Sequence, residues 1–426
     1  MSVALSLVLL VVASYLAAHV AFEWLGHRLL IVSGAEYLLL GVLLGPHVSG
    51  VVSAQQVESF APVTALALGW MGAIIGSRLR LQQLVRVRAA SYNVALAESI
   101  ITLGVVFGLE LYLLRWLFDL SSASAFGPAL ALAAFAVATA DTGITLATRR
   151  HGSQRALVAQ LQTSAGMNAF VAVCTFSILL ATTHPANPSF ERQLTTTEWT
   201  VVSIAIGVAG GALFHLFLGG ERRMDRLFVS LAGVIILVSG AATYLQLSPV
   251  MSAMFFGIIL VNTSRQYEEI RAVLTRVERP LYFVLLIIAG AMWRPSLQSA
   301  WVLPVLLFLV ARALCKVGGA RLAARSNHLL PVLGPRWGHA LLGQGGLVIA
   351  LAVNYLYQGA LAIPDVVFSA AVVSVLLTDL VSGRLASSVL EASEDAFPPS
   401  AEPARERANT GKVADVPLAH HGAENA

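Results

Sequence analysis

Long apolar segments follow one another along this chain, with short polar loops between them. A helix needs about 20 predominantly apolar residues to cross the hydrocarbon core of a bilayer, which is about 30 Å thick. The pattern therefore predicts an all-α polytopic membrane protein with about 13 transmembrane helices. The predicted spans are residues 3–22, 29–45, 60–77, 90–118, 127–148, 156–182, 197–218, 227–246, 248–263, 280–294, 300–324, 337–357 and 362–390.

The composition agrees with this class of protein. Of the 426 residues, 57% are hydrophobic and 12% are charged, whereas about a quarter of the residues in a soluble domain are charged. The spans leave no room within residues 3–390 for a soluble catalytic domain, so we do not expect an enzyme. Residues 391–426 are rich in Pro, Ala, Glu and Arg. They cannot bury enough apolar surface to fold, which predicts a disordered cytoplasmic tail.

Arginines gather in every second loop, and the opposite loops hold only Arg115, Arg192 and Arg294. Cytoplasmic loops of membrane proteins attract basic residues. We therefore expect a multi-pass protein of the cell (inner) membrane, with its N-terminus outside and its C-terminus in the cytoplasm. The net charge of +4 follows from these loops and does not predict nucleic-acid binding. The arginines of the basic loops are Arg28, Arg78, Arg80, Arg86, Arg88, Arg149, Arg150, Arg155, Arg222, Arg223, Arg226, Arg265, Arg271, Arg276, Arg279, Arg321, Arg325 and Arg336.

Two spans are interrupted by glycine and polar residues where a membrane helix is normally most apolar. The fifth contains Ala138–Gly143, and the twelfth contains Leu342–Gly346. If the seventh span is a connector, they hold the same place in two six-helix halves. Broken helices at matching places of inverted repeats point to the ion site of a secondary transporter, because unwound backbone within a membrane is tolerated where it lines a cavity.

Asp141 is the strongest candidate for the exchanging group. It lies near the middle of the fifth span, beside Thr139. An ionised carboxylate is costly at this depth, so it is suited to exchange a proton for a metal cation near neutral pH. Threonine hydroxyls and the free carbonyls of a helix break are oxygen ligands suited to Na⁺, K⁺ or Li⁺. The alternative is a structural carboxylate paired with a buried cationic side chain.

Two basic residues of the eleventh span, Arg312 and Lys316, lie four residues apart and therefore on one helix face. Each is costly at the bilayer centre, so both are expected to face the protein interior. Arg312 is the deeper and is predicted to compensate Asp141 or the helix ends at the crossing. Lys316 is either a second compensating charge or a side chain that reaches toward the cytoplasmic interface.

Polar residues on other spans complete the candidate site. Gln344 lies in the second break, where its amide can ligand a cation or cap a half-helix. Asn168 follows several polar residues on the sixth span, which suggests a cavity-facing surface. Glu98, on the fourth span, is a secondary candidate, although structural pairing or an interfacial position is the favoured interpretation for Glu98, Glu110 and Asp379. The glycines of the second break are Gly343, Gly345 and Gly346.

Other catalytic motifs are absent from the sequence. There is no Gly-x-x-x-x-Gly-Lys-Ser/Thr loop, so ATP-driven transport by this chain alone is unsupported. Neither His-Glu-x-x-His, Cys-x-x-Cys nor Gly-x-Ser-x-Gly occurs. No cofactor and no bound metal centre is expected.

Several motifs occur in an order that is typical of one family. Glu36–Pro46 is similar to an early "GxxxGP" helix, and Gly76–Leu81 to a "GxxxxL" exit. Thr139–Asp141 falls at the "TD" of a first broken helix, and Ala311–Leu314 at an "AR" stretch. Gly343–Leu347 replaces the "GLRG" or "PRGE" type of second break. Over roughly residues 3–390, the chain resembles the monovalent cation:proton antiporters, which include the sodium/hydrogen exchangers.

This resemblance implies a homodimer of thirteen-helix protomers that carry a monovalent cation and H⁺ across the lipid bilayer. It implies a dimerisation domain formed by residues 3–77 and 227–294. It also implies a mobile core, formed by residues 90–182 and 300–390, that carries the ion across like an elevator.

The sixth span departs from the family pattern. Members carry "ND", "DD" or "QD" there, and the aspartate binds the ion and the proton, whereas this chain has Asn168 and Ala169. An amide can ligand a cation but cannot take up a proton in exchange. Proton exchange must then depend on Asp141 or Glu98.

Three kinds of function stay open. The first is exchange of protons for Na⁺ or K⁺. The second is an antiporter-like protein without proton exchange, acting as a uniporter, channel or sensor subunit, which the missing aspartate favours. The third is an organic-anion symporter with Arg312 as its binding group, or a membrane enzyme.

Overall fold

The computed structural model describes residues 34–84, 88–150, 155–185, 192–218, 224–264, 266–294, 301–357 and 361–396. The first predicted span, 3–22, and the tail beyond residue 396 lie outside these ranges. Within them the regular structure is entirely helical. The helices are α2 (Ala35–Leu44), α3 (Ala54–Ser59), α4 (Ala61–Ser77), α5 (Leu81–Leu84), α6 (Ala89–Phe118), α7 (Ser122–Val137), α8 (Thr142–Arg150), α9 (Arg155–Thr182), α10 (Thr196–Leu218), α11 (Met224–Tyr244), α12 (Pro249–Thr263), α13 (Tyr267–Met292), α14 (Val302–Leu314), η2 (Cys315–Gly319), α15 (Ala320–Ser326), α16 (Leu330–Leu333), η3 (Trp337–Leu341), α17 (Gly345–Leu356) and α18 (Pro364–Ala396).

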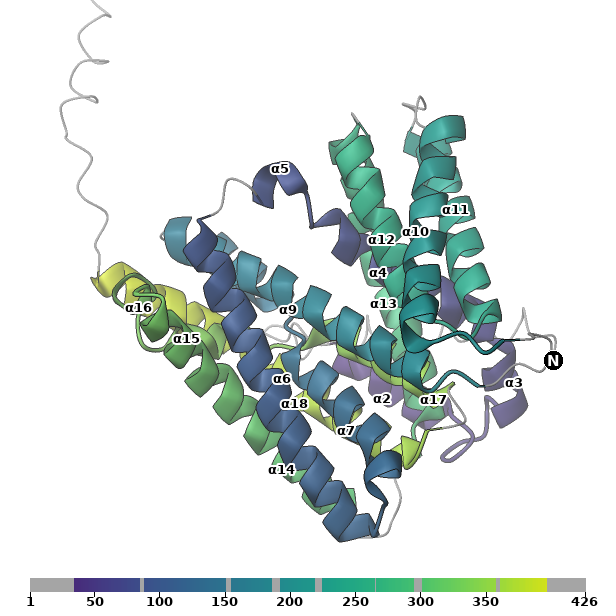
Figure 1. The fold of residues 1–426 in the computed structure, drawn as a ribbon, viewed down its shortest axis with the longest axis horizontal. Helices are drawn as coiled ribbons and strands as arrows, with labels where there is room; N and C mark the ends of the chain where they lie inside the picture. The colour runs from purple at the N-terminus through teal and green to yellow at the C-terminus, as the bar shows by residue number, and fades with distance from the viewer. Residues whose placement is uncertain are drawn as a thin grey trace, which may run out of the picture.

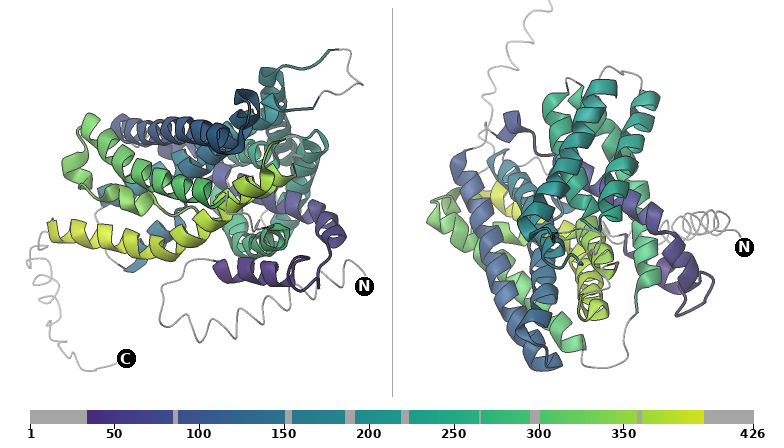
Figure 2. Two further views of the ribbon diagram at one scale, coloured as in Figure 1. Left: turned by 90° about the horizontal axis from the view of Figure 1, so that it is seen from below. Right: turned by 45° about the vertical axis from the view of Figure 1, so that its right-hand side comes forward.

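The long helices form two groups that run in different directions (Figure 1). In the first group α4 packs along α12, α11 and α13, with α10 against α12 and α2 against α13. In the second group α6 packs against α7, α9 and the α14–α15 helix, and α18 packs against α8, α14 and α17. Figure 2 shows the same division from two further directions. We call them the α4–α12 bundle and the α6–α9 bundle.

Glycines set how closely the helices of the α4–α12 bundle approach. A Cβ atom added at Gly72 would lie 2.2 Å from the carbonyl oxygen of Val250, and one at Gly76 would lie 2.0 Å from that of Met254. A Cβ atom added at Gly257 of α12 would lie 2.3 Å from the carbonyl oxygen of Ala73. In a bilayer the solvent is as apolar as the helices, so close backbone packing between small residues is the main force that holds helices together.

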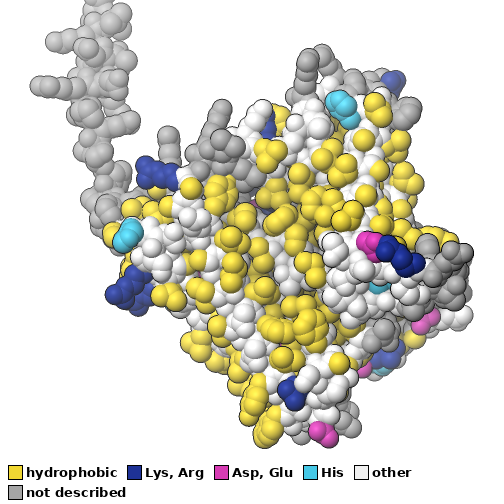
Figure 3. All heavy atoms as spheres, in the orientation of Figure 1, with side chains coloured by type: hydrophobic (Ala, Val, Ile, Leu, Met, Phe, Trp, Pro, Cys, Tyr) yellow, Lys and Arg dark blue, Asp and Glu magenta, His cyan; other side chains and the backbone are white. Residues whose placement is uncertain are grey.

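The outer face of α6 is apolar, and its buried face combines polar with apolar residues. Charged and polar residues such as Glu98 and Thr102 are fully buried, and large apolar side chains point outward. Figure 3 shows how widely hydrophobic side chains cover one face of the molecule. This pattern suits a helix with lipid on one side and protein on the other. The outward-facing residues of α6 are Leu96, Ile100, Val105, Leu109, Tyr112 and Trp116.

The predicted spans coincide with helices wherever the chain is described. Among the described residues, seven helices are long and apolar enough to cross a membrane, and Ala61–Ser77, Pro249–Thr263 and Gly345–Leu356 are shorter apolar helices. The all-α membrane fold is therefore confirmed.

Two boundaries differ from the prediction. The charged stretch Arg265–Arg279 was expected to separate two spans, but most of it forms the first turns of α13, which continues through Pro280. The charged residues of this stretch led to the prediction of a loop. A charged segment can instead be the part of a helix that extends beyond the bilayer. At the other end α18 continues to Ala396, past the predicted boundary at residue 390.

Candidate ion-exchange site

Two interrupted helices cross inside the α6–α9 bundle. The first stops at Val137 and resumes as α8 at Thr142, and the second stops with η3 at Leu341 and resumes as α17 at Gly345. The non-helical segments between them meet where the backbone N–H of Ala140 donates to the carbonyl oxygen of Gly343 at 2.9 Å. The predicted pair of broken, crossing helices is present.

The crossing requires glycine at the start of α17. Gly345 has a φ of +62°, in the left-handed region that side chains with a Cβ disfavour. A Cβ added there would also lie 2.7 Å from the Cβ of Ala140. The two breaks can approach this closely because the residue at their contact has no side chain.

Two cationic side chains donate hydrogen bonds to the backbone carbonyls at which the half-helices of both breaks end. Arg312 donates from Nη1 to the carbonyl of Leu342 at 2.8 Å and from Nη2 to that of Ala138 at 3.3 Å. Lys316 donates from Nζ to the carbonyl of Val137 at 2.6 Å. The C-terminal end of a helix carries partial negative charge. The two basic residues therefore neutralise the ends of the half-helices that stop at the crossing.

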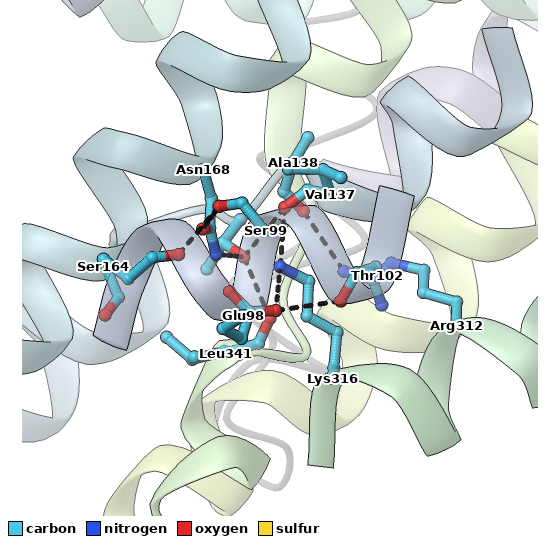
Figure 4. A network of polar contacts seen from close by, with 12 residues as sticks. Glu98, Ser99, Thr102, Val137, Ala138, Ser164, Asn168, Arg312, Lys316 and Leu341 are labelled. Atoms are coloured by element: carbon cyan, nitrogen blue, oxygen red, sulfur yellow. Dashed lines mark hydrogen bonds and ion pairs between the residues drawn. The ribbon is translucent and has the colours of Figure 1, made fainter. Parts of the chain in front are cut away.

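Lys316 also forms an ion pair with Glu98 from α6, with Nζ 3.0 Å from Oε1 and both side chains 0% exposed (Figure 4). Thr102 donates a further hydrogen bond to this Oε1, while Oε2 is buried without a partner. Lys316 lies on the π-helical turn η2 (Cys315–Gly319). Such turns are frequent at functional sites, because the widened turn redirects a side chain.

Asn168 connects α9 to α6 and to the first break. Its Oδ1 accepts a hydrogen bond from the Ser99 hydroxyl at 2.6 Å, and its Nδ2 donates to Thr139 Oγ1 at 3.0 Å. The Thr139 hydroxyl in turn donates to the carbonyl of Leu341 at 3.2 Å. Figure 4 shows Ser99 and Asn168, two members of this chain of neutral groups, beside the Glu98–Lys316 pair. We call the chain of neutral groups and the ion pair together the crossing network.

Asp141 lies outside the crossing network. Its Oδ2 is 2.8 Å from Nη1 of Arg78, which follows the last residue of α4, and the two side chains are 28% and 30% exposed. Asp141 immediately precedes α8, where the partial positive charge of a helix N-terminus favours a carboxylate. The structure therefore gives Asp141 a half-buried position at the first break, bonded to a residue of the other bundle.

Gln344 and Asp379 organise the second break. The side-chain amide of Gln344 donates to the carbonyl of Phe135 at 2.9 Å, and the Ser374 hydroxyl donates to its Oε1. One carboxylate oxygen of Asp379 accepts the backbone N–H groups of Gln344 at 3.1 Å and Gly345 at 3.2 Å. Asp379 thus caps the positive end of α17, as Asp141 lies at the positive end of α8.

The sequence pointed to Asp141, Thr139, Asn168, Arg312, Lys316, Gln344 and Glu98, and each lies at or beside the crossing. It did not indicate Ser99 or Thr102. Their spacing from Glu98 is the signal that was available, because residues one, three and four apart form a polar patch on one side of a helix. Arg78 was counted only as a topology signal. Asp379 was expected to have a structural or interfacial role, and it caps a helix.

The chain is similar in sequence and in fold to known membrane transporters. A family model described as "Sodium/hydrogen exchanger, transmembrane" matches residues 8–392. A structure of the sodium proton antiporter MjNhaP1 from Methanocaldococcus jannaschii at pH 8 is 16% identical, with a TM-score of 0.65 over 90% of this chain and 97% of that one. An electron-microscopy structure of MjNhaP1 is 15% identical, with a TM-score of 0.63 over 93% of this chain and 98% of that one. No curated protein matches the sequence.

Proposed function

Because this chain belongs to the sodium/hydrogen exchanger family, we propose that it exchanges protons for a monovalent cation, Na⁺ or K⁺, across a membrane. The observation that carries this proposal is the fully buried Glu98–Lys316 pair, which contacts the carbonyl end of the first break. A buried carboxylate needs one positive partner. A side-chain ammonium, a proton and a metal ion can each fill that place, and alternation among them is the chemistry of exchange.

Glu98 is the carboxyl that we assign to the exchanged proton. It lies in the crossing network, and its Oε2 is open to a further ligand. Thr139 Oγ1, Asn168 Oδ1 and the backbone carbonyls of the break are the oxygen ligands proposed for the cation. Asn168 then supplies an oxygen ligand but no charge, so one carboxylate serves both ions.

Asp141 is the second candidate for the exchanging group. It is the carboxylate closest in sequence to the first break, and it is reachable from water, with 28% of its side chain exposed. Glu98 has the stronger support because its side chain contacts Lys316 and Thr102 inside the crossing network, whereas Asp141 is paired with Arg78 at the edge. Substitution of each carboxyl by its amide separates the two assignments.

The remaining features of the proposal come from the family resemblance and the loop charges. We propose that residues 3–77 and 227–294, which contain most helices of the α4–α12 bundle, form a dimerisation domain of a homodimer. Residues 90–182 and 300–390 form the core that moves. The N-terminus lies outside the cell membrane and the C-terminus in the cytoplasm.

A protein that carries a cation without proton exchange is the alternative that one observation favours. Both polar groups of the Asn168 amide are already hydrogen-bonded, to Ser99 and Thr139, and no carboxylate stands beside them on α9. An organic-anion symporter is less favoured, because both Nη atoms of Arg312 are bonded to backbone carbonyls of the breaks.

The test is a proteoliposome assay with a pH-reporting dye inside the vesicles. Addition of Na⁺, K⁺ or Li⁺ in turn should dequench the dye for at least one ion, which identifies the substrate. Cation uptake measured in parallel with a radioactive tracer completes the assay. Tracer uptake without any proton movement would support the uniporter alternative and reject exchange.

A further inference from the structure

Arg78 joins the two helix bundles. Its guanidinium pairs with Asp141 of the first break at 2.8 Å, and it lies 3.5 Å from Glu278 of α13. Asp141 belongs to the α6–α9 bundle, and Glu278 belongs to the α4–α12 bundle. One cation therefore stands between a carboxylate of each bundle.

The backbone that carries Arg78 is fixed to its own bundle. The Asn262 side chain of α12 donates to the carbonyl of Leu79 at 3.1 Å and accepts the N–H of Leu81 at 2.8 Å. These bonds hold the exit of α4 against α12 on both sides of Arg80. Asp141 is fixed instead by the crossing, where its neighbour Ala140 bonds to Gly343. The Arg78–Asp141 contact is thus made between two independently anchored segments.

We propose that Arg78 is a positioning residue for transport, whose guanidinium keeps the Asp141 carboxylate paired with the α4–α12 bundle. This rests on the proposed function, in which the bundles move relative to each other. Movement requires the Arg78–Asp141 pair to separate, and Glu278 remains as a partner for the released guanidinium. The pair favours the arrangement described here and withholds the Asp141 carboxylate from other cations.

A partly exposed ion pair contributes modestly, so its removal should shift an equilibrium rather than abolish the fold. The first experiment measures amide hydrogen exchange at residues 138–145 in the purified full-length protein. Arg78→Gln should raise the exchange rate there about two- to fivefold. Arg78→Lys should keep most of the protection, because it keeps the charge.

Glu278→Gln is the matched control. It removes the other carboxylate of the same guanidinium but leaves the contact between bundles, so exchange at residues 138–145 should stay at the wild-type rate. Equal exchange in wild type and Arg78→Gln would overturn the proposal, as would an equal increase in Glu278→Gln. If Arg78→Gln does not fold, Asp141→Asn takes its place, because it removes the other partner of the same contact. This variant should raise exchange at residues 138–145 by a similar factor, and unchanged exchange would reject the inference.

Transport supplies a second readout. In proteoliposomes Arg78→Gln should lower the apparent KM for the cation about two- to fivefold, because it releases Asp141, and Arg78→Lys should restore the wild-type KM. A purely structural role would lower the maximal rate and leave KM unchanged, which would count against the proposal. Hydrogen exchange is measured without transport, so failure of the proposed function and failure of this inference can be told apart.

Discussion

At the scale of single residues, the crossing network depends on charges that have no access to water. Glu98 and Lys316 are both 0% exposed and 3.0 Å apart. A buried pair of this kind adds little net stability over an apolar pair of the same shape. Each partner nevertheless depends on the other, because the loss of one leaves an unpaired charge in a medium that solvates it poorly.

Glu98→Gln should therefore destabilise the protein by about 3–5 kcal/mol, since it leaves the Lys316 ammonium without a counter-charge. The double variant Glu98→Gln with Lys316→Met should recover most of this loss. Thermal unfolding in detergent measures both. A single variant as stable as the wild type would contradict a buried ion pair at this position.

The same substitutions assign the proton. If Glu98 carries it, the double variant should fold yet show no proton movement in the vesicle assay. Asp141→Asn should then retain exchange with an altered KM for the cation. If Asp141 carries the proton, as the sequence alone suggested, Asp141→Asn abolishes proton movement. Exchange that survives in the Glu98 double variant would exclude the assignment to Glu98.

At the scale of helices, the crossing is built from four half-helices whose ends are each matched by a side chain of opposite charge. Arg312 and Lys316 contact the carbonyl ends, Asp379 caps the start of α17, and Asp141 precedes α8. Gly345 allows the breaks to touch. The interruption is therefore a specific, charge-compensated structure, in which several backbone groups left by the missing helical turns have side-chain partners.

Gly345→Ala tests this arrangement. Its positive φ costs an alanine about 1–2 kcal/mol, and the overlap with the Ala140 Cβ adds to that. Combining it with Ala140→Gly should remove the overlap and recover part of the stability, measured by thermal unfolding. Gly104→Ala on α6 is the control, because its Cβ would meet no atom within 4 Å. An equal effect of the two alanines would contradict a special role for Gly345.

At the scale of the whole molecule, the two bundles meet where α9 packs against α10 and α12, and where α17 packs against α4 and α13. The α4–α12 bundle is bound together by backbone approach at Gly72, Gly76 and Gly257. The α6–α9 bundle contains the crossing network. Arg78 pairs with Asp141 across the boundary. Relative motion of the two bundles would therefore separate this ion pair.

A chemical link across this boundary should stop transport. We expect cysteines at positions 78 and 141, joined by a short flexible bismaleimide in a background with Cys174 and Cys315 replaced by serine, to lose activity when linked. The comparison is the same variant before linking. Linking positions 78 and 278, both in one bundle, should change transport little. Full activity after complete linking of positions 78 and 141 would argue against relative motion there.

Periodicity and composition were sufficient to predict the spans that the structure describes and both breaks, because apolar runs and glycine clusters are local properties of the sequence. They also indicated that Arg312 and Lys316 face inward, since charge at that depth is costly. These two properties do not predict which side chains on different helices form pairs. The pairing of Lys316 with Glu98, and of Asp141 with Arg78, depends on how helices distant in sequence rotate against each other. Packing decides that rotation, and no single-helix pattern contains it.

The matched charges at the crossing have an electrical consequence. Glu98, Asp379, Arg312 and Lys316 contribute two negative and two positive charges when Glu98 is ionised. In the proposed exchange Glu98 takes up either a proton or one Na⁺ or K⁺, so the core carries the same net charge on both crossings, and a constant charge such as that of Asp141 adds equally to each. Displacing one elementary charge through 100 mV takes about 2.3 kcal/mol of work, and this work cancels between the two opposite crossings. Vesicles clamped at different potentials should accordingly reach the same final cation distribution at a given pH gradient, whereas a uniporter would follow the voltage.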